Sequence, residues 1–106
     1  MSGSRTITRD DGLLDNVHPG AILREDFLIG GEIPVEEAAC GAGIARERLD
    51  AILAEKGAVD ANIDLRLARY FGMSEGFFLG LQIDYDLEEE RRAHGAELAR
   101  IVRRAA

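Results

Sequence analysis

Apolar residues of this chain recur at spacings of three and four, which place them on one face of a helix. Strand-like alternation is weak along the whole sequence, so the pattern predicts an all-α fold. Glycines and the two prolines divide this pattern into segments. We therefore predict five helices, near residues 19–29, 34–41, 45–55, 61–71 and 75–92.

Helix-boundary residues stand at the ends of these segments. Pro19 and Pro34 suit a first helical turn, where the missing N–H costs no hydrogen bond. Gly43 and Gly72 suit helix ends, because glycine adopts the left-handed conformation without strain. Three further residues are predicted at or near helix N-caps: His18, Asp60 and Ser74.

The pattern also divides the chain into three parts around one small core. Residues 1–16 are polar and lack a helical period, which predicts a flexible N-terminal arm. Residues 17–90 form the helical domain, and residues 91–106 form a C-terminal helical tail with a break near Gly95. The predicted core residues are Leu23, Phe27, Ala39, Ile44, Leu49, Ile52, Ile63, Leu67 and Phe71.

Charge and composition narrow the class of protein. The 106 residues carry 13 basic and 20 acidic side chains, a formal net charge of −7. This balance disfavours non-specific binding to a polyanion and favours a basic protein partner. No apolar run reaches the roughly 18–20 residues of a membrane helix, and the N-terminus has no apolar stretch of a signal peptide. We therefore expect no membrane association and a cytoplasmic location.

Reactive side chains are few and scattered. Cys40 is the single cysteine, and His18 and His94 lie too far from it for a metal-ligand spacing. The sequence has no recognisable pairing of a nucleophile with a base and no glycine-rich phosphate loop. We therefore expect no enzyme activity, no metal site and no cofactor.

Residues 35–53, VEEAACGAGIARERLDAIL, have the layout of a helix-turn-helix. Ala39 is small where two helices come close, and Gly43 follows four residues later, where a turn requires positive φ. Three apolar residues after the turn are expected to anchor the second helix of the motif: Ile44, Leu49 and Ile52.

Two blocks flank this motif, HPGAIL at 18–23 and RLARYFGMSEGFFLGLQIDYD at 66–86. In this order the chain resembles the HigA family of antitoxins, also described as virulence-associated protein I or plasmid-maintenance antidote proteins. The family belongs to the wider Xre or lambda-repressor-like group, and the resemblance covers about residues 17–90. The matching residues are His18, Pro19, Gly20, Leu23, Arg66, Leu67, Ala68, Arg69, Phe71, Gly72, Ser74, Phe78, Leu81, Gln82, Tyr85 and Asp86.

The resemblance implies a five-helix lambda-repressor-like domain with an extended C-terminal helix, and it implies a homodimer. It also implies an antitoxin of a type II toxin–antitoxin pair. Such a protein binds operator DNA as an autorepressor and neutralises a basic RelE-like ribonuclease toxin, HigB. The alternative is an interaction-only protein whose helix-turn-helix no longer reads DNA.

The chain departs from the family in its DNA-reading part. Val35 stands where members usually place Gln, and Asp50 stands where Asn or Ser is usual. The charges within residues 44–57 cancel. A carboxylate beside a phosphate is repulsive, whereas one facing a base can accept a hydrogen bond from cytosine N4. Since the sequence does not orient these carboxylates, operator reading and the interaction-only alternative both remain open.

The third predicted helix should enter the major groove with Ala45, Arg46 and Glu47 nearest the bases. Arg46 and Arg48 either contact guanine or phosphate, or form ion pairs on a solvated face. Lys56 either contacts phosphate or is an ordinary cation at a helix end. The predicted DNA-binding residues are Ala45, Arg46, Glu47, Arg48, Asp50 and Lys56.

Apolar residues of the fifth helix and the tail exceed what one small core can cover. Phe77 and Phe78 lie about 100° apart on a helix, so we expect one in the core and the other at an interface. The acidic residues of 84–90 are either a docking surface for a basic toxin or a solvated run. The predicted dimer interface consists of Phe78, Leu81, Leu98, Ile101 and Val102.

Overall fold

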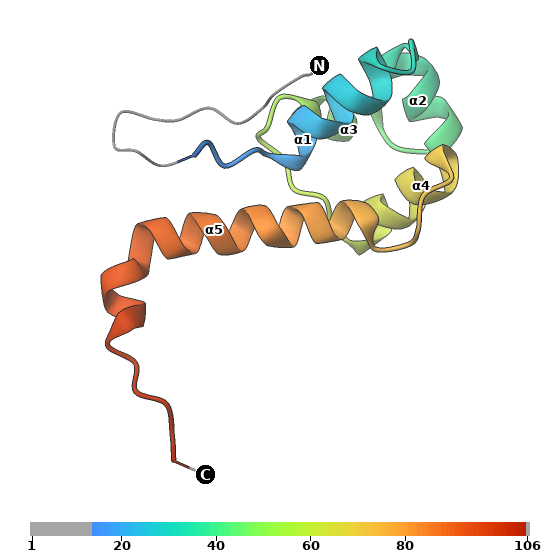
Figure 1. The fold of residues 1–106 in the computed structure, drawn as a ribbon. Coiled ribbons are helices and arrows are strands. Elements are labelled where there is room, and N and C mark those ends of the chain that lie inside the picture. The colour runs from blue at the N-terminus through green and yellow to red at the C-terminus, as the bar shows by residue number, and fades with distance from the viewer. Residues whose placement is uncertain (1–13, 106) are drawn as a thin grey trace.

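The computed structural model describes residues 14–105. The predicted all-α fold is confirmed, and the first predicted helix comprises an α-helical part, α1, and a π-helical part, η1 (Figure 1). No helix in the described range is long and apolar enough to cross a membrane. The elements are α1 (Pro19–Ile22), η1 (Leu23–Ile29), α2 (Val35–Ala42), α3 (Arg46–Leu53), α4 (Ala61–Phe71) and α5 (Phe77–Ala99).

The HPG block, residues 18–20, begins α1 and packs it against α3. His18 caps the helix as predicted, because its Nδ1 accepts a hydrogen bond from the Gly20 N–H at 2.9 Å. Pro19 occupies the first turn. A Cβ on Gly20 would lie 1.8 Å from the Ile52 carbonyl oxygen, so only glycine allows this close contact.

The core lies where α2, α3 and α4 meet the first helix and the start of α5. Seven of the predicted core residues are buried, whereas Phe27 and Phe71 are only partly buried against the cluster. Phe78 is 1% exposed, and its ring lies 5.1 Å from that of Phe27. The prediction of Phe78 at a dimer interface is therefore wrong, because the direction of α5 turns Phe78 inward and leaves Phe77 at the margin.

A buried carboxylate on α4 fixes the start of α5. Asp64 accepts hydrogen bonds from the N–H groups of Gly76 at 2.6 Å and Leu79 at 2.8 Å. Because Asp64 takes these otherwise unsatisfied donors, α5 begins at Phe77 and the predicted cap at Ser74 is wrong. Gln82 adds a second tie, since its side-chain oxygen accepts from the Val59 N–H at 2.9 Å.

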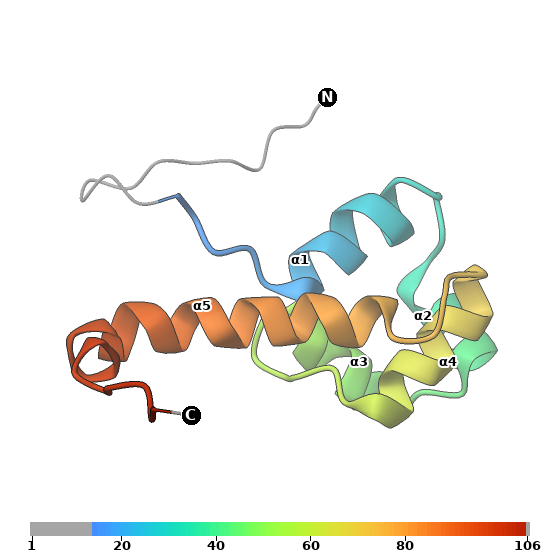
Figure 2. The ribbon, with the colours of Figure 1, turned by 60° about the horizontal axis from the view of Figure 1, so that its bottom comes forward.

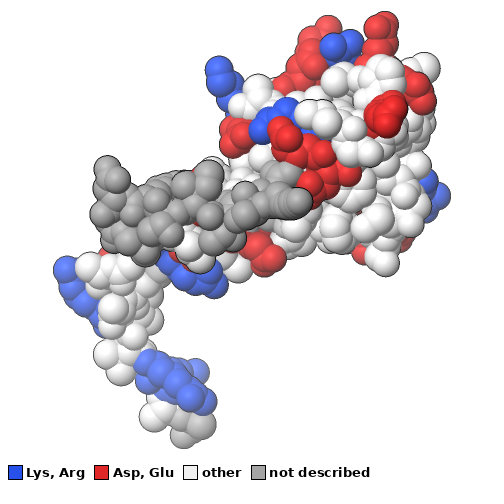
Figure 3. All heavy atoms as spheres, turned by 45° about the horizontal axis from the view of Figure 1, so that its top comes forward, with Lys and Arg blue, Asp and Glu red and all other residues white. Residues whose placement is uncertain are grey.

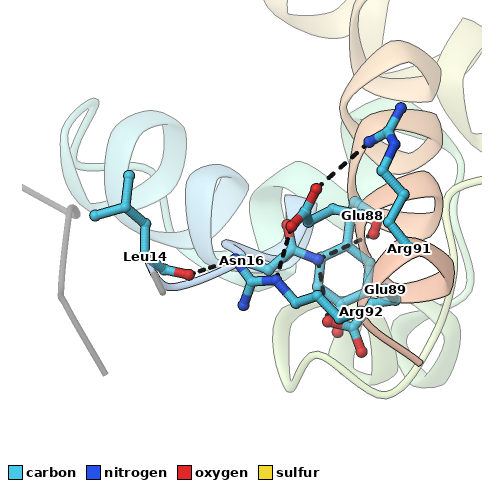
Figure 4. A network of polar contacts seen from close by, with 7 residues as sticks. Leu14, Asn16, Glu88, Glu89, Arg91 and Arg92 are labelled. Carbon is cyan, nitrogen blue, oxygen red and sulfur yellow. Dashed lines mark hydrogen bonds and ion pairs between the residues drawn. The ribbon is translucent and has the colours of Figure 1, made fainter. Parts of the chain in front are cut away.

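One face of α5 is covered by the chain's own N-terminal side. Asn16 donates to the Tyr85 carbonyl and to Glu89, both at 3.0 Å, and Arg92 donates to the Leu14 carbonyl (Figure 4). Residues 14–16 are therefore held against α5, contrary to the prediction of a flexible arm that includes them. The remainder of that predicted arm, residues 1–13, lies outside the described residues.

The far end of α5 leaves the body of the molecule. The backbone of His94 is non-helical, with φ −128° and ψ 22°, and the helix bends there, one residue before the predicted break at Gly95. Beyond this kink the chain turns away from the other helices (Figures 1 and 2). The apolar side chains of the tail are consequently exposed, with Ile101 at 71% and Val102 at 87%.

Candidate nucleic-acid interface

The turn between α2 and α3 sets the direction of α3. Gly43 has φ 69° and ψ 35°, the left-handed conformation predicted for it. The Ile44 N–H donates to the Ala39 carbonyl at 2.9 Å, which closes the turn. Ala39 is buried between the helices, as its small size predicts. The two helices therefore have the fixed arrangement of a helix-turn-helix.

This arrangement buries one face of α3 and exposes the other. Leu49, Ile52 and Leu53 point into the core, with Leu49 at 1% exposure. All six predicted DNA-binding residues are exposed to solvent. Ala45 precedes the helix and offers no side-chain cap, so the first N–H groups of α3 have no side-chain acceptor within residues 14–105.

Arg46 is bound to carboxylates on both of its sides. Its Nε lies 3.0 Å from Asp50 Oδ1 one turn along α3, and its Nη1 lies 4.0 Å from Glu36 Oε1 on α2. Both side chains of the shorter pair are about half exposed, so this ion pair is weak and its partners can exchange. The structure thus places Arg46 on the open face, with its charge more than offset.

Arg48 points away from the open N-terminal end of α3. Its Nη2 lies 3.1 Å from Asp60 Oδ2 and donates to the Ala58 carbonyl at 3.1 Å. Asp60 also caps α4 by accepting from the Ile63 N–H at 2.9 Å, as predicted. This hydrogen bond, and after it the contact with Arg48, lowers the pKa of Asp60 below its usual value. Arg48 therefore stabilises the α3–α4 connection.

Glu47 and Lys56 are the two charged groups of this region that form no ion pair with residues 14–105. Glu47 stands in the first turn of α3, and Lys56 lies just beyond the C-terminal end of that helix. Between them Glu55 pairs with Arg24 of η1 at 3.3 Å. The open face thus combines one free carboxylate, one free ammonium and one compensated guanidinium.

The fold and this motif are shared with antitoxins of known structure. No family model matches the chain. It is 35% identical over 72 residues to the virulence-associated protein I of Dichelobacter nodosus, which covers 68% of this chain and 67% of that protein. It is 30% identical to a HigA-family addiction module antidote protein of Coxiella burnetii, with a TM-score of 0.77 over 85% of this chain and 98% of that one.

The chain belongs to the HigA family of antitoxins. A further member of this structural group is the antitoxin GraA in complex with its operator. GraA is 34% identical with a TM-score of 0.76, and the match covers 85% of this chain and 91% of GraA. The resemblance inferred from the two flanking blocks is thus confirmed, and so is the expectation of an antitoxin instead of an enzyme.

This HigA-family chain also exposes an apolar face on α5 that the sequence pattern did not single out. Ile83 and Leu87 lie on the side of α5 opposite Phe78, and they are 49% and 48% exposed. Leu81, predicted at the dimer interface, is partly buried and packs against the core. The helical spacing of the apolar residues at 79, 83 and 87 is the signal that could have identified this face. The aromatic residues nearby are the more conspicuous candidates for an interface.

The tail of the HigA-family chain differs in charge from the rest. Residues 91–106 hold five arginines and one glutamate, a net charge of +4, whereas residues 1–90 hold eight basic and nineteen acidic residues, a net charge of −11. Figure 3 shows acidic side chains gathered over the helical body and basic ones on the projecting tail. Basic and apolar groups therefore stand together on a segment that its own body does not cover.

Proposed function

We propose that this chain is an autorepressing antitoxin, which binds operator DNA through α3 and neutralises a basic RelE-like ribonuclease toxin. The observation that carries the DNA-binding part is the exposed N-terminal turn of α3 on a helix-turn-helix, in a fold matched to GraA in its operator complex. In this proposal α3 enters the major groove with Ala45, Arg46 and Glu47 nearest the bases. Because a repressor acts where its operator DNA lies, the proposal includes a cytoplasmic location.

The other predicted DNA-binding residues have supporting roles in this proposal. Lys56 contacts a backbone phosphate, because its ammonium is exposed and unpaired within the described chain. Asp50 holds Arg46 until DNA competes for the guanidinium, and Arg48 keeps α3 in place through Asp60. Since the body is acidic, we expect weak affinity for random DNA and a steep loss of operator binding with salt.

We propose that the operator-binding form is a homodimer whose interface includes the outer face of α5. A two-fold axis across antiparallel α5 helices brings Ile83 of one copy against Leu87 of the other. Gly80 lies on the same side, and a Cβ built there would meet nothing within 4 Å, so the two helices can approach closely. Exposure of both apolar side chains in a single chain supports this interface.

The tail extends the proposed dimer interface. Leu98, Ile101 and Val102 supply exposed apolar surface beyond the kink at His94. Arg100, Arg103 and Arg104 form no ion pair with the described residues, and the net charge of −11 on residues 1–90 offers them a complementary surface on a second copy. The predicted tail residues thus remain in the proposed interface, and Ile83 and Leu87 take the place of Phe78 and Leu81.

The toxin half of the proposal is supported by charge. Residues 1–90 carry a net charge of −11, and acidic side chains gather on the face of the helical body seen in Figure 3. Such a surface accelerates encounter with a basic protein and favours a complex with it.

Co-expression with the basic RelE-like product of a neighbouring gene tests the toxin half of the proposal directly. Relief of toxin-induced growth arrest is expected, and continued arrest despite equal expression contradicts it.

The DNA half is tested by fluorescence anisotropy with the chain's own upstream region and a scrambled duplex of equal length. We expect the upstream DNA to bind at least about 100-fold more tightly at a fixed salt concentration. Arg69→Gln, at an exposed position of α4, serves as a charge control outside the helix-turn-helix and the proposed dimer interface. Equal affinity for both duplexes would favour the interaction-only protein, in which α3 is a scaffold.

A further inference from the structure

The charged side chains on α3 differ in whether the chain itself already binds them. Arg46 is bound by Asp50 at 3.0 Å and by Glu36 at 4.0 Å. Arg48 is bound by Asp60 and the Ala58 carbonyl, both at 3.1 Å, on the side of the α3–α4 connection. Neither arginine is free to read a base without first breaking an interaction within the chain.

Glu47 differs from both arginines in this respect. Its side chain is exposed in the first turn of α3 and forms no ion pair with residues 14–105. Ala51, one turn further along α3, is small and uncharged. Glu47 therefore has no bulky or charged side chain one turn after it on the helix surface.

A carboxylate only accepts hydrogen bonds, so it can face few base edges. Guanine presents acceptors in the major groove, and thymine presents an acceptor and a methyl group. Cytosine presents the N4 amino donor, whereas the adenine N6 donor stands beside the N7 acceptor. Cytosine is thus the base edge that fits an unpaired glutamate without repulsion from a neighbouring acceptor.

We propose that Glu47 determines operator specificity by accepting a hydrogen bond from the N4 amino group of cytosine. This inference rests on the proposed entry of α3 into the major groove, and it assigns the base that α3 selects. Recognition by Glu47 works partly by exclusion, since its charge is repelled wherever the amino donor is missing. An acidic residue in the first turn of α3 thereby becomes a source of selectivity instead of only a repulsive charge near the DNA.

The test is selection of binding sites from duplexes with a randomised half-site, followed by affinity measurements on the selected sequences. The wild-type chain should select cytosine at one position of each half-site, with a preference of about 10- to 100-fold. Glu47→Gln should move the preference at that position to adenine, because an amide can pair with both N6 and N7. Preferences at the remaining positions should not change.

Glu37→Gln is the matched control, since Glu37 is an exposed carboxylate on α2 without an ion pair to the described residues. It should tighten binding to all sequences alike. If Glu47→Gln does only the same and keeps the wild-type base preference, the assignment of Glu47 is wrong. If the wild-type chain selects no sequence at all, the proposed operator binding itself is overturned.

Discussion

At the scale of single residues, the decisive side chains are the buried ones whose polar atoms accept hydrogen bonds from backbone N–H groups. His18, Asp64 and Gln82 are the buried polar residues of the described chain. Their partners are backbone N–H groups two, 12 or more, and 23 residues away. Leaving such donors unpaired in the interior is costly, so these acceptors hold the helices in register.

His18 makes stability depend on pH. Its Nδ1 accepts from Gly20 N–H, its ring contacts Tyr85 edge-on at 4.8 Å, and burial lowers its pKa below 6.5 despite the opposing charges of Glu55 and Asp86. The unfolded chain therefore takes up this proton first as pH falls. We expect His18 to contribute its full stability above about pH 6.5 and to lose it progressively below that value.

Urea denaturation between pH 7.5 and 5.5 measures this effect. His18→Asn keeps an N-cap acceptor but removes the titrating group, so its free energy of unfolding should vary less over this range. Equal pH dependence in both proteins would show that His18 is not the responsible group.

Asp50→Asn tests how the chain restrains Arg46. The substitution removes a negative charge near the proposed DNA surface and weakens the hold on the guanidinium. We expect operator affinity to rise by about two- to fivefold, in keeping with the energy of one exposed ion pair. Anisotropy titration checks this. In the Arg46→Ala background the gain should fall to that of a simple charge removal such as Glu37→Gln, and an undiminished gain there would exclude the release of Arg46 as a cause.

At the scale of elements, α5 consists of two parts that differ in how they contact the rest of the chain. Its first turns are fixed to the body by Asp64 and Gln82, and its middle turns hold residues 14–16 on one side. After the kink at His94, the same helix leaves the body. The kink therefore separates a packed part from a projecting part that the described body does not cover.

Asp64→Ala should detach the start of α5. The change leaves the N–H groups of Gly76 and Leu79 without their charged acceptor, at a cost of about 2–4 kcal/mol in the free energy of unfolding. Urea denaturation gives this value. Asp84→Ala, an exposed acidic position on the same helix, should change stability by less than about 0.5 kcal/mol. Similar effects of the two substitutions would contradict the role of Asp64.

At the scale of the whole molecule, shape and charge are both in keeping with the proposed dimer. The radius of gyration is 16.3 Å, whereas a compact chain of this length has about 13 Å. The tail projects from the helical body and is also the basic part of an acidic chain (Figures 1 and 3). A second copy would cover the apolar groups of the tail and balance its charge.

The dimer is tested with Leu87→Glu. Sedimentation of the wild-type chain at micromolar concentration should give twice the chain mass of 11.6 kDa. A charge at Leu87 should shift the distribution to single chains, because the substitution places two carboxylates at the proposed two-fold interface. Ile29→Glu, at an exposed apolar position on η1, should leave the dimer intact. A wild-type monomer, or a dimer unaffected by Leu87→Glu, would refute this interface.

The sequence by itself determined the number and approximate limits of the helices, the turn at Gly43 and the family. These features depend on short-range rules, since helical period, capping and positive φ are set within a few residues. Even the cap at His18 and the ion pair between Arg46 and Asp50 belong to this class, because their partners lie within one helical turn.

The tertiary structure alone decided which side of α5 faces inward. Adjacent helical residues differ by about 100°, so the pattern could not choose between Phe77 and Phe78, and it left Ile83 and Leu87 unnoticed. It also decided that Asp64, instead of Ser74, caps α5, and that Arg48 pairs with Asp60. These outcomes depend on where separate helices meet in space, and local spacing carries no information on that.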